Sequence, residues 1–393
     1  MPIDTDRIEL VDNRYRVDRQ LGEGGMGVVY LVDDRLRRGR RVALKKIRPE
    51  EVNDESIRYF QQEFEALAGL RHPNLCEVYD FGVLPKTGEF YFTLEYLVGT
   101  DLFVATRGAP AETILDDLVQ MCRALEYIHS RGFIHHDLKP ANVMVVEGEP
   151  RRVKLMDFGL VGQESQKRVE VRGTLNYIAP ELFDGGVVDR RSDLYSLGIL
   201  LYKILRGKLP VEDRPTGLAA DFYMGVVPRP PSAQELHVLP EPFRAIVARL
   251  VKINPAERYR SANQVIEDVN RHVATPHALE TKATSESYIL STRLVGREDE
   301  RRVLGSLLEE FRSRGLEQPF WLIHGERGIG KSRLVREFRI QCQLEGVPFY
   351  LGPAYEQGGE AYGPFRALLR EVVSMLGPDH PAVASYARTL SVL

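Results

Sequence analysis

Residues 134–142 read IHHDLKPAN, and the fold of the chain is organised around this stretch. An apolar segment leads into it, and the apolar run VMVV follows at 143–146. Asp137 and Asn142 lie five positions apart, with Lys139 between them. A carboxylate can accept the proton of an attacking hydroxyl, an ammonium can neutralise a transferring phosphoryl group, and an amide oxygen can bind a hard cation. The alternative is that these residues are solvated polar groups in a turn.

The triplet DFG at 157–159 follows a strand-like segment, fifteen residues after Asn142. Two acids and an amide that converge on one point suit Mg²⁺, which takes oxygen ligands and shares them with substrate phosphates. In this order the two motifs resemble the catalytic loop and metal-binding triplet of the eukaryotic-like (Hanks-type) protein kinases. The resemblance implies that Asp137 positions the hydroxyl and accepts its proton, while Lys139 stabilises the transferred group. It also implies that Asn142 and Asp157 bind Mg²⁺.

A glycine-rich stretch, GEGGMGVV at 22–29, lies between two strand-like segments. Glycines let a backbone approach phosphates without Cβ clashes. Because a strand rather than a helix follows, the pattern argues against a dinucleotide-binding fingerprint, although a glycine-rich hairpin turn without a ligand has the same sequence. The kinase resemblance implies that the loop covers the phosphates of ATP. The residues implied in ATP binding here are Leu21, Gly22, Glu23, Gly24, Gly25, Met26, Gly27 and Val29.

Lys45, in a strand-like VALK segment, resembles the kinase lysine that holds the α- and β-phosphates of ATP. Apolar residues spaced at i, i+4 and i+7 predict a helix over 56–70. Glu63 in that helix takes the place of the family's glutamate that pairs with the lysine, and Glu65 is the alternative. Without such a partner, Lys45 is an ordinary strand lysine.

Residues 90–97 alternate like a strand. In the kinase family this strand leads into the hinge between the lobes, where adenine bonds to the backbone. The resemblance implies that Leu94 is the gatekeeper and that Glu95 and Leu97 supply backbone contacts. Ala43 completes the residues implied in ATP binding.

The apolar spacing turns helical from residue 111 and predicts a second, mostly helical lobe. Residues 160–172 resemble an activation segment, which GTLNYIAPE at 173–181 closes. The segment 193–198 resembles the family's helix that braces the catalytic loop. The resemblance implies that Glu181 pairs with Arg258, for which a helix-cap residue or an ordinary surface charge is the alternative.

The composition is that of a globular protein, with 43% hydrophobic and 28% charged residues. A net charge of −3 provides no global basic field, so we expect no nucleic-acid partner. The three cysteines lack the spacing of a metal site or a disulfide framework. No apolar run predicts a signal peptide or a membrane segment. We therefore expect a soluble, cytoplasmic protein.

A second motif, GERGIGKS at 325–332, matches the P-loop pattern. The apolar run at 320–324 predicts a buried strand before it, and the apolar spacing after it predicts a helix. Backbone N–H groups would hold phosphates at the helix N-terminus, the lysine would reach the β- and γ-phosphates, and the serine would bind Mg²⁺. The residues implied in this second site are Gly325, Gly330, Lys331 and Ser332.

The region 294–393 resembles the AAA-related ATPase modules that are fused to bacterial kinases. The P-loop carries this resemblance together with VGRE at 295–298 and YGPF at 362–365. No apolar run ending in a Walker-B aspartate follows Lys331. We therefore expect an incomplete module that binds nucleotide rather than hydrolysing it.

The segments together predict an α+β fold with a bilobal kinase, β-rich in the N-lobe and helical in the C-lobe, followed by the start of an α/β P-loop NTPase domain. We expect the catalytic loop to transfer the γ-phosphoryl group of ATP, with Mg²⁺, to Ser/Thr hydroxyls of a protein substrate, because its lysine resembles the serine/threonine branch. Two alternatives stay open: a pseudokinase scaffold that binds nucleotide, and a signalling ATPase regulated by its kinase domain. The expected boundaries are 1–14 for a lead-in, 15–272 for the kinase, 273–293 for a linker and 294–393 for the partial P-loop domain.

One departure from the family pattern leads to a prediction. The family usually has arginine before the catalytic aspartate, where this chain has His136. That arginine commonly binds a phosphate on the activation segment, whereas imidazole titrates near neutrality and lacks a bidentate fork. Ser165 is one of the few phosphate acceptors on the activation segment. We therefore expect Ser165→Ala to leave most of the kinase turnover in place when phosphate incorporation is measured. A collapse of turnover would contradict this expectation.

Overall fold

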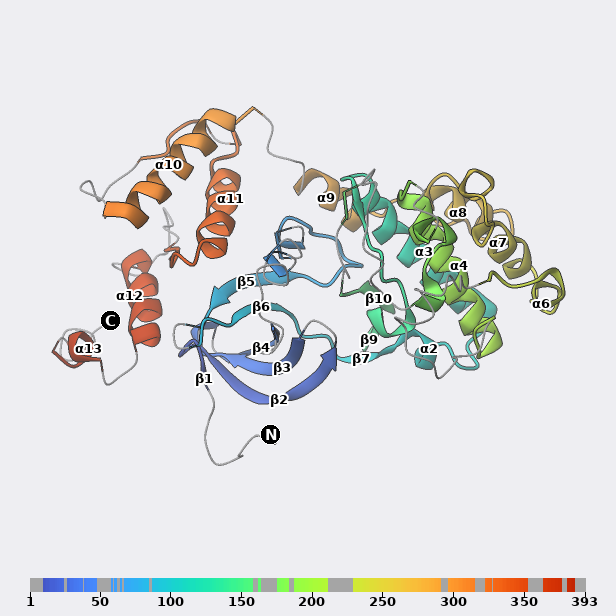
Figure 1. Ribbon diagram of the computed structural model, residues 1–393, viewed down its shortest axis with the longest axis horizontal. Coiled ribbons are helices and arrows are strands. Elements are labelled where there is room, and N and C mark those ends of the chain that lie inside the picture. Colours follow the sequence, from blue (N-terminus) through green and yellow to red (C-terminus); the bar gives the residue numbers. More distant parts are fainter. Residues whose placement is uncertain are drawn as a thin grey trace. The chain divides into compact units, whose positions relative to one another are not determined.

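The computed structural model divides the chain into two compact units (Figure 1). The first unit comprises Met1–Phe64, Val78–Tyr96 and Arg293–Leu393, and the second comprises Glu65–Glu77 and Leu97–Thr292. The structure describes residues 10–24, 27–37, 39–47, 58, 60–61, 64–65, 67–84, 87–157, 162–163, 175–183, 187–210, 229–290, 296–314, 322–326, 328–352, 363–376 and 380–385.

A six-stranded antiparallel sheet, in the order β1-β2-β3-β4-β6-β5, forms what we call the strand lobe of the first unit (Figure 1). Side chains alternate between the two faces of a strand, and one face buries Val32, Val42 and Leu44 with Tyr15 and Tyr91. This burial is what the alternating strand patterns predict. The strands are β1 (Leu10–Val11), β2 (Tyr15–Gly24), β3 (Gly27–Asp34), β4 (Arg40–Lys46), β5 (Val78–Val83) and β6 (Phe90–Glu95).

Gly27 is the position in the glycine-rich hairpin where the backbone requires glycine. It opens β3 opposite Gly24 and has φ of 154°. A Cβ atom at position 27 would lie 2.1 Å from the carbonyl oxygen of Lys46 on the neighbouring strand. A side chain here would therefore push β3 away from β4. Gly25 and Met26 lie outside the described residues.

A helical segment packs aromatic side chains against the sheet. Phe60 and Phe64 are 2% and 0% exposed. The ring centroid of Phe60 lies 4.8 Å from that of Phe92, and the ring centroid of Phe64 lies 5.0 Å from that of Phe81. At these positions the predicted amphipathic helix is confirmed, because four-residue spacing places both rings on one face.

Helices dominate the second unit. Helix α3 packs against α8 and strand β10, and α4 packs against α7. The face of α3 predicted from its spacing, Leu118 to Ile128, is buried. The helices are α2 (Leu102–Ala105), α3 (Ala111–His129), α4 (Arg190–Arg206), α6 (Ala233–His237), α7 (Phe243–Leu250), α8 (Ala262–Val269) and α9 (Lys282–Leu290).

Short strands and 3₁₀ turns surround the catalytic-loop sequence in this unit. One three-stranded sheet has the order β10-β9-β7, and β8 pairs with β11. The strands are β7 (Gly99–Asp101), β8 (Phe133–Ile134), β9 (Val143–Val146), β10 (Arg152–Leu155) and β11 (Gly162–Gln163). The 3₁₀ turns of the two units are η1 (Arg35–Arg37), η3 (Pro140–Asn142), η4 (Leu175–Tyr177), η5 (Pro180–Leu182) and η6 (Pro255–Glu257).

The segment 273–293, expected to be a linker, contains helix α9, which packs against α3. The ring of Tyr288 on α9 meets that of Tyr127 edge-on, with centroids 5.3 Å apart. The guanidinium carbon of Arg131 lies 3.7 Å from the ring centroid of Tyr127 and 5.2 Å from that of Tyr288. The sequence conceals this packing because few large apolar residues occur between Val273 and Arg293, and one tyrosine makes the ring contact.

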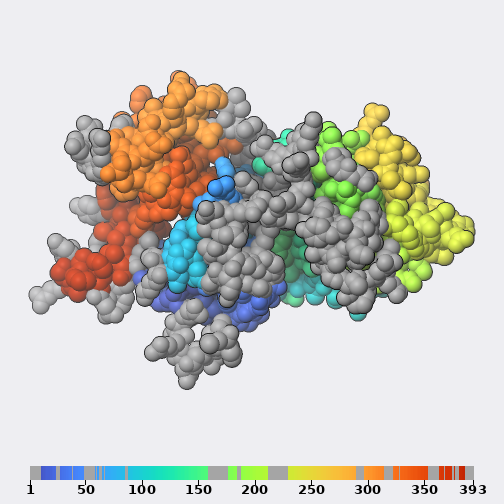
Figure 2. Space-filling view, in the orientation of Figure 1, coloured from blue at the N-terminus to red at the C-terminus, as the bar shows by residue number. Residues whose placement is uncertain are grey.

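The regular elements among the described residues of 296–385 are helices, and the other described residues are turns or irregular. The predicted buried strand at 320–324 is wrong for its described residues, 322–324, and Leu322 is 72% exposed. A strand needs a hydrogen-bonded neighbour, and the described residues of this region provide none. Helix α10 lies on the visible face of its unit (Figure 2). Its Val303 and Phe311 are exposed. The helices are α10 (Glu298–Arg314), α11 (Lys331–Leu344), α12 (Gly363–Leu376) and α13 (Pro381–Ser385).

The three cysteines, Cys76, Cys122 and Cys342, are buried free thiols. Burial raises the pKa of the Cys122 thiol, and it raises the pKa of Cys342 to about 11.

Within the described parts of the chain, no helix is both long enough and apolar enough to cross a membrane.

Arg258 and Glu181 form the buried ion pair expected from the sequence. Nη1 and Nη2 of Arg258 donate to Oε1 and Oε2 of Glu181, each at 2.7 Å. The other three N–H groups donate to the carbonyl oxygens of Lys252, Arg191 and Ile253. Arg258 is 1% exposed, and all five of its donors are used. The charge can be buried because every donor has an acceptor.

We predict that Arg258→Met lowers the free energy of unfolding by about 3–5 kcal/mol, because it leaves the Glu181 carboxylate buried without its counter-charge. Urea unfolding at neutral pH measures the loss. The matched control, Arg258→Met with Glu181→Met, removes both charges and should recover a large part of the stability. An Arg258→Met variant as stable as the wild type would contradict the prediction.

Candidate active site

The catalytic-loop sequence runs from β8 through η3 into β9 within the second unit. His135 and Leu138 are fully buried, so they fix the loop to the interior. The N–H of Asp137 donates to the carbonyl oxygen of His135 at 2.9 Å. His136 has φ of 64°, in the left-handed region that residues with a Cβ seldom adopt. The resulting turn separates the buried histidine side chains from Asp137.

The backbone of this turn is held by Asp193, in the first turn of α4. Its Oδ2 accepts from the His135 N–H at 2.8 Å, and its Oδ1 accepts from the His136 N–H at 3.0 Å. His129 Nε2, at the end of α3, lies 2.7 Å from Oδ2. Burial acts to raise the pKa of Asp193, but the hydrogen bond with His129 and the electrostatic interactions with the nearby histidines outweigh it and lower the pKa to about 2. Asp193 is therefore an ionised carboxylate that fixes two consecutive peptide groups.

Two side chains predicted to be catalytic, Asp137 and Lys139, meet the predicted metal ligand Asn142 in one hydrogen-bonded cluster. Lys139 Nζ donates to Asp137 Oδ2 at 2.7 Å. Asn142 Nδ2 donates to the same oxygen and to the main-chain oxygen of Asp137, both at 2.8 Å. The side chains of Asp137 and Lys139 are 13% and 26% exposed. The carboxylate is thus oriented by two donors and stays accessible.

Asp157 follows β10 and lies beside the same cluster. Asn142 Nδ2 approaches the main-chain oxygen of Asp157 at 3.4 Å, and the Met156 N–H donates to the Asn142 carbonyl at 2.9 Å. Asp157 has φ of 46°, a second left-handed position for a residue with a side chain. Such positions are frequent at functional sites, where the surrounding structure supports the strain. The structure therefore brings Asp137, Lys139, Asn142 and Asp157 together.

The donor set at Asn142 and Asp157 fits Mg²⁺. Because the Asn142 amide nitrogen faces Asp137, the amide oxygen is the atom left for a cation. Within the described residues, no cluster of three or more His, Cys, Asp or Glu side chains could hold a metal. Mg²⁺ does not need such a cage, since it commonly binds one or two protein oxygen ligands together with water and substrate phosphates.

Lys45 lies on β4 of the strand lobe, in the first unit. It is 8% exposed, and its Nζ lies 5.5 Å from the ring centroid of Phe92, its cross-strand neighbour on β6. Glu63, expected to pair with Lys45, lies outside the described residues, and Glu65 is exposed.

The other residues predicted to bind ATP lie along the strands of the same sheet or just past it. Ala43 is buried on β4 opposite Leu94, which the resemblance makes the gatekeeper. Leu21, Gly22, Glu23 and Gly24 lie on β2, Gly27 and Val29 on β3, and Glu95 at the end of β6, while Leu97 belongs to the second unit.

The P-loop sequence bends sharply into helix α11. Gly330, immediately before the helix, has φ of 99°, which glycine adopts readily. Lys331 Nζ donates to the carbonyl oxygens of Gly325 and Glu326, each at 2.8 Å. Ser332 follows in the first turn of α11. The described loop residues therefore lie at a helix N-terminus, where backbone N–H groups can bind an anion.

His136 occupies the place of the usual arginine and cannot replace its charge. It is 8% exposed, and burial lowers its pKa. Its Nε2 has no hydrogen-bond partner among the residues that the structure describes. A neutral, buried imidazole is unsuited to binding a phosphate, in line with the expectation from the sequence.

His129 is a residue of the site that sequence reasoning missed. It closes an ordinary amphipathic helix, and its partner Asp193 lies 64 positions later. No local pattern marks such a pair, because a histidine at a helix end usually indicates only favourable placement near the helix dipole.

Comparison with known families and proteins finds two matches along the chain. Residues 15–270 match the protein kinase domain, and residues 293–391 match the AAA ATPase domain. The chain is similar to the serine/threonine-protein kinase PknB of Mycolicibacterium smegmatis, with 37% identity over 275 residues. The match covers 66% of this chain and 43% of the relative. PknB of Mycobacterium tuberculosis is 35% identical over 274 residues, again covering 66% and 43%.

A solved structure resembles the same region. The Mycobacterium tuberculosis PknI kinase domain superposes with a TM-score of 0.51 at 28% identity, covering 68% of this chain and all of that one. The curated relatives are longer than the match, since the chain spans 43% of the length of each PknB protein.

We predict that the stability supplied by Asp193 depends on pH below about 4. Its folded-state pKa of about 2 lies below the ordinary value of 3.8, so the paired carboxylate stabilises the fold above pH 4 and loses this effect as pH falls toward 2. The unfolding free energy of the wild type minus that of Asp193→Asn should stay constant between about pH 5 and 7. It should then shrink by about 2 kcal/mol toward pH 2.

Urea unfolding over this pH range measures the difference. Asp299→Asn is the matched control, because the Asp299 side chain is 84% exposed on α10 and pairs with an arginine rather than a histidine. A difference between wild type and Asp193→Asn that does not change with pH would contradict the account.

Proposed function

Because the chain belongs to the protein kinase family, we propose that it transfers the γ-phosphoryl group of ATP to serine or threonine hydroxyls of protein substrates. The observation that carries the proposal is the cluster of Asp137, Lys139 and Asn142, in which two donors orient one accessible carboxylate. The similar PknB proteins, which are named serine/threonine-protein kinases, support the choice of acceptor.

Each side chain of the cluster has a distinct task in this proposal. Asp137 orients the substrate hydroxyl and accepts its proton, because its carboxylate is accessible and held by Asn142. Lys139, now hydrogen-bonded to Asp137, is a compact cation that can stabilise charge on the transferred phosphoryl group. Catalysis of this kind consists mainly of positioning and electrostatic stabilisation.

Mg²⁺ would be held by the Asn142 amide oxygen and the Asp157 carboxylate. When bound, the ion neutralises the charge of the nucleotide phosphates. The protein's own contribution is the orientation of the Asn142 amide, fixed by two hydrogen bonds to Asp137. Lys45 would hold the α- and β-phosphates, with Glu63 as its proposed partner.

A nucleotide-binding scaffold without transfer is the second candidate, and one observation favours it. His136 stands where the family usually has arginine, and it is buried. Despite this replacement, Lys139 and Asn142 both donate hydrogen bonds to the Asp137 carboxylate. The group proposed to accept the proton is therefore oriented. We therefore rank transfer above scaffolding.

The P-loop at 325–332 is proposed to bind the phosphates of a second nucleotide. Gly325 and Gly330 shape the turn, Lys331 would contact the β- and γ-phosphates, and Ser332 would bind Mg²⁺. The left-handed Gly330 before α11 and the match to the AAA ATPase domain support this assignment.

We predict that Asp137→Asn lowers phosphate incorporation into a protein substrate by about 10²–10⁴-fold, because an amide cannot accept the hydroxyl proton. Transfer of labelled phosphate from ATP measures the effect, with phosphoamino-acid analysis to show serine or threonine. Asp116→Asn, the same change at an exposed position, is the control. Equal incorporation by wild type and Asp137→Asn would refute the proposed transfer and favour the scaffold.

A further inference from the structure

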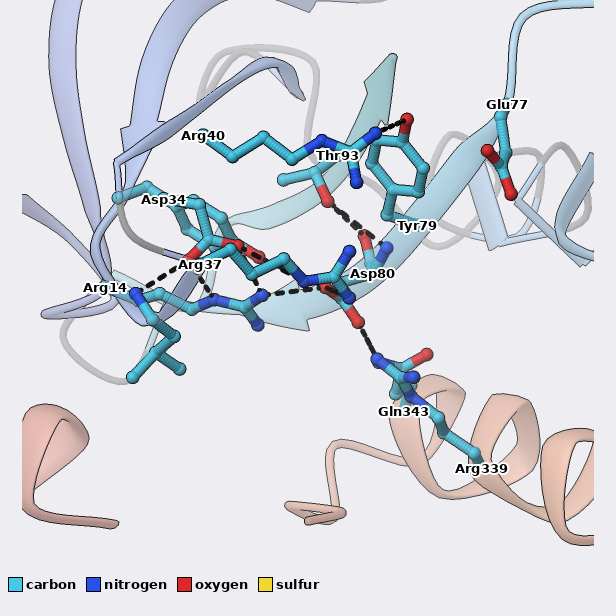
Figure 3. A network of polar contacts seen from close by, with 12 residues as sticks. Arg14, Asp34, Arg37, Arg40, Glu77, Tyr79, Asp80, Thr93, Arg339 and Gln343 are labelled. Atoms are coloured by element: carbon cyan, nitrogen blue, oxygen red, sulfur yellow. Dashed lines mark hydrogen bonds and ion pairs between the residues drawn. The ribbon is translucent and has the colours of Figure 1, made fainter. Parts of the chain in front are cut away.

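Strand β5 carries a buried carboxylate, Asp80, that two parts of the first unit share. Asp80 is 4% exposed. Its Oδ2 accepts a hydrogen bond from Arg14 at 3.0 Å and lies 3.7 Å from a guanidinium nitrogen of Arg37. Its Oδ1 accepts from Arg339 and, at 3.2 Å, from Gln343, both on α11 (Figure 3). Residues of the strand lobe therefore contact one carboxylate oxygen of Asp80, and residues of α11, the helix that follows the P-loop, contact the other. We call α11 with its P-loop the P-loop segment.

A positive charge on α11 helps to stabilise the ionised form of Asp80. Burial acts to raise the pKa of Asp80, but Arg14, Arg339 and Arg37 together lower it. Burial raises the pKa of Glu371 on α12, and the nearby charges of Arg14 and Arg339 act in the opposite direction. A buried carboxylate needs compensating charge, and one of the three arginines that supply it comes from α11.

A separate contact joins the C-terminal end of α11 to the first unit's helical segment. Gln61 Nε2 donates to the main-chain oxygen of Leu344, the last residue of α11, at 3.3 Å. The last carbonyls of a helix lack intrahelical partners, so this side chain satisfies one of them. Helix α12 also packs against η1, the 3₁₀ turn that ends at Arg37. The docking therefore does not depend on Asp80 alone.

Helix α11 has the P-loop at one end and the docking residues at the other. It starts at Lys331, and Arg339 and Gln343 lie four residues apart on one face. A helix rises 1.5 Å per residue, so these two side chains are roughly 12–18 Å along the axis from the P-loop lysine. A rigid secondary element such as this helix can carry a displacement of its N-terminus to Arg339 and Gln343.

We propose that α11 docks on strand β5 through Arg339, Gln343 and Asp80, and that this contact couples nucleotide occupancy of the P-loop to the strand lobe of the kinase. The occupant of the β5 surface is this chain's own P-loop segment. The coupling rests on the proposed function of the P-loop, whereas the docking does not.

Hydrogen exchange of the full 393-residue chain tests the docking. Arg339→Glu places a negative charge against Asp80, so exchange in 78–83 and 331–344 should rise by roughly tenfold or more. Arg302→Glu is the matched control, because Arg302 is 73% exposed on α10 and pairs with Asp299, three residues earlier on the same helix. Unchanged exchange in Arg339→Glu would overturn the docking. Exchange in α4 reports whether the variant is folded.

A double-mutant cycle tests the coupling. The probe is adenosine 5′-(β,γ-imido)triphosphate with Mg²⁺, and the readout is exchange in 78–83. Lys331→Ala should reduce the response to the probe, and in the Arg339→Glu background the same substitution should have no further effect. Equal effects of Lys331→Ala in both backgrounds, or no effect in either, would overturn the coupling.

Two further comparisons separate the possible outcomes. Protection of 78–83 that is independent of protein concentration supports docking within one chain, and concentration-dependent protection would overturn it in favour of docking between copies. Exchange does not require catalysis, so a failure of the proposed kinase activity would appear as absent Asp137-dependent phosphate incorporation while the exchange result stands.

Discussion

The candidate active site depends on one buried carboxylate, Asp193. It accepts the N–H groups of His135 and His136 and pairs with His129, so it joins α3, α4 and the catalytic loop at a single point. The helix that presents it begins at an aspartate N-cap, Asp189, and packs against α7. The left-handed turn at His136 can persist because surrounding hydrogen bonds determine it. The interior of the helical lobe thereby fixes the position of Asp137.

Local patterns predicted the parts of this fold, and the long-range contacts were predicted only where a family motif pointed to them. Alternation predicted the strands because one face of each is buried, and the apolar spacing predicted α3 and α11. Resemblance predicted the Glu181–Arg258 pair, which spacing alone could not. The pairing of His129 with Asp193 escaped prediction because 64 residues separate the partners. The strand expected at 320–324 was wrong at its described residues, 322–324, because strands depend on neighbours rather than on their own composition.

Two buried aspartates perform similar tasks in the two units. Asp193 connects the catalytic loop to the helical lobe, and Asp80 connects the strand lobe to the P-loop segment. In both, burial would favour the neutral acid, but hydrogen-bond donors and basic side chains nearby outweigh burial and lower the pKa of the carboxyl group. Removing water from a carboxylate makes its partners specific, because an unpaired charge in that position is costly. Each aspartate therefore links elements that are far apart in the sequence.

The central claim is that the frame built on Asp193 orients Asn142 and Asp157 toward a shared Mg²⁺ next to Asp137. An experimental structure of the chain with Mg²⁺ and a non-hydrolysable ATP analogue tests it most directly. The account predicts the Asn142 amide oxygen and an Asp157 carboxylate oxygen at about 2.0–2.1 Å from Mg²⁺, with the Asp193 hydrogen bonds to His135 and His136 retained. Mg²⁺ bound without either residue, or a catalytic loop detached from Asp193, would contradict it.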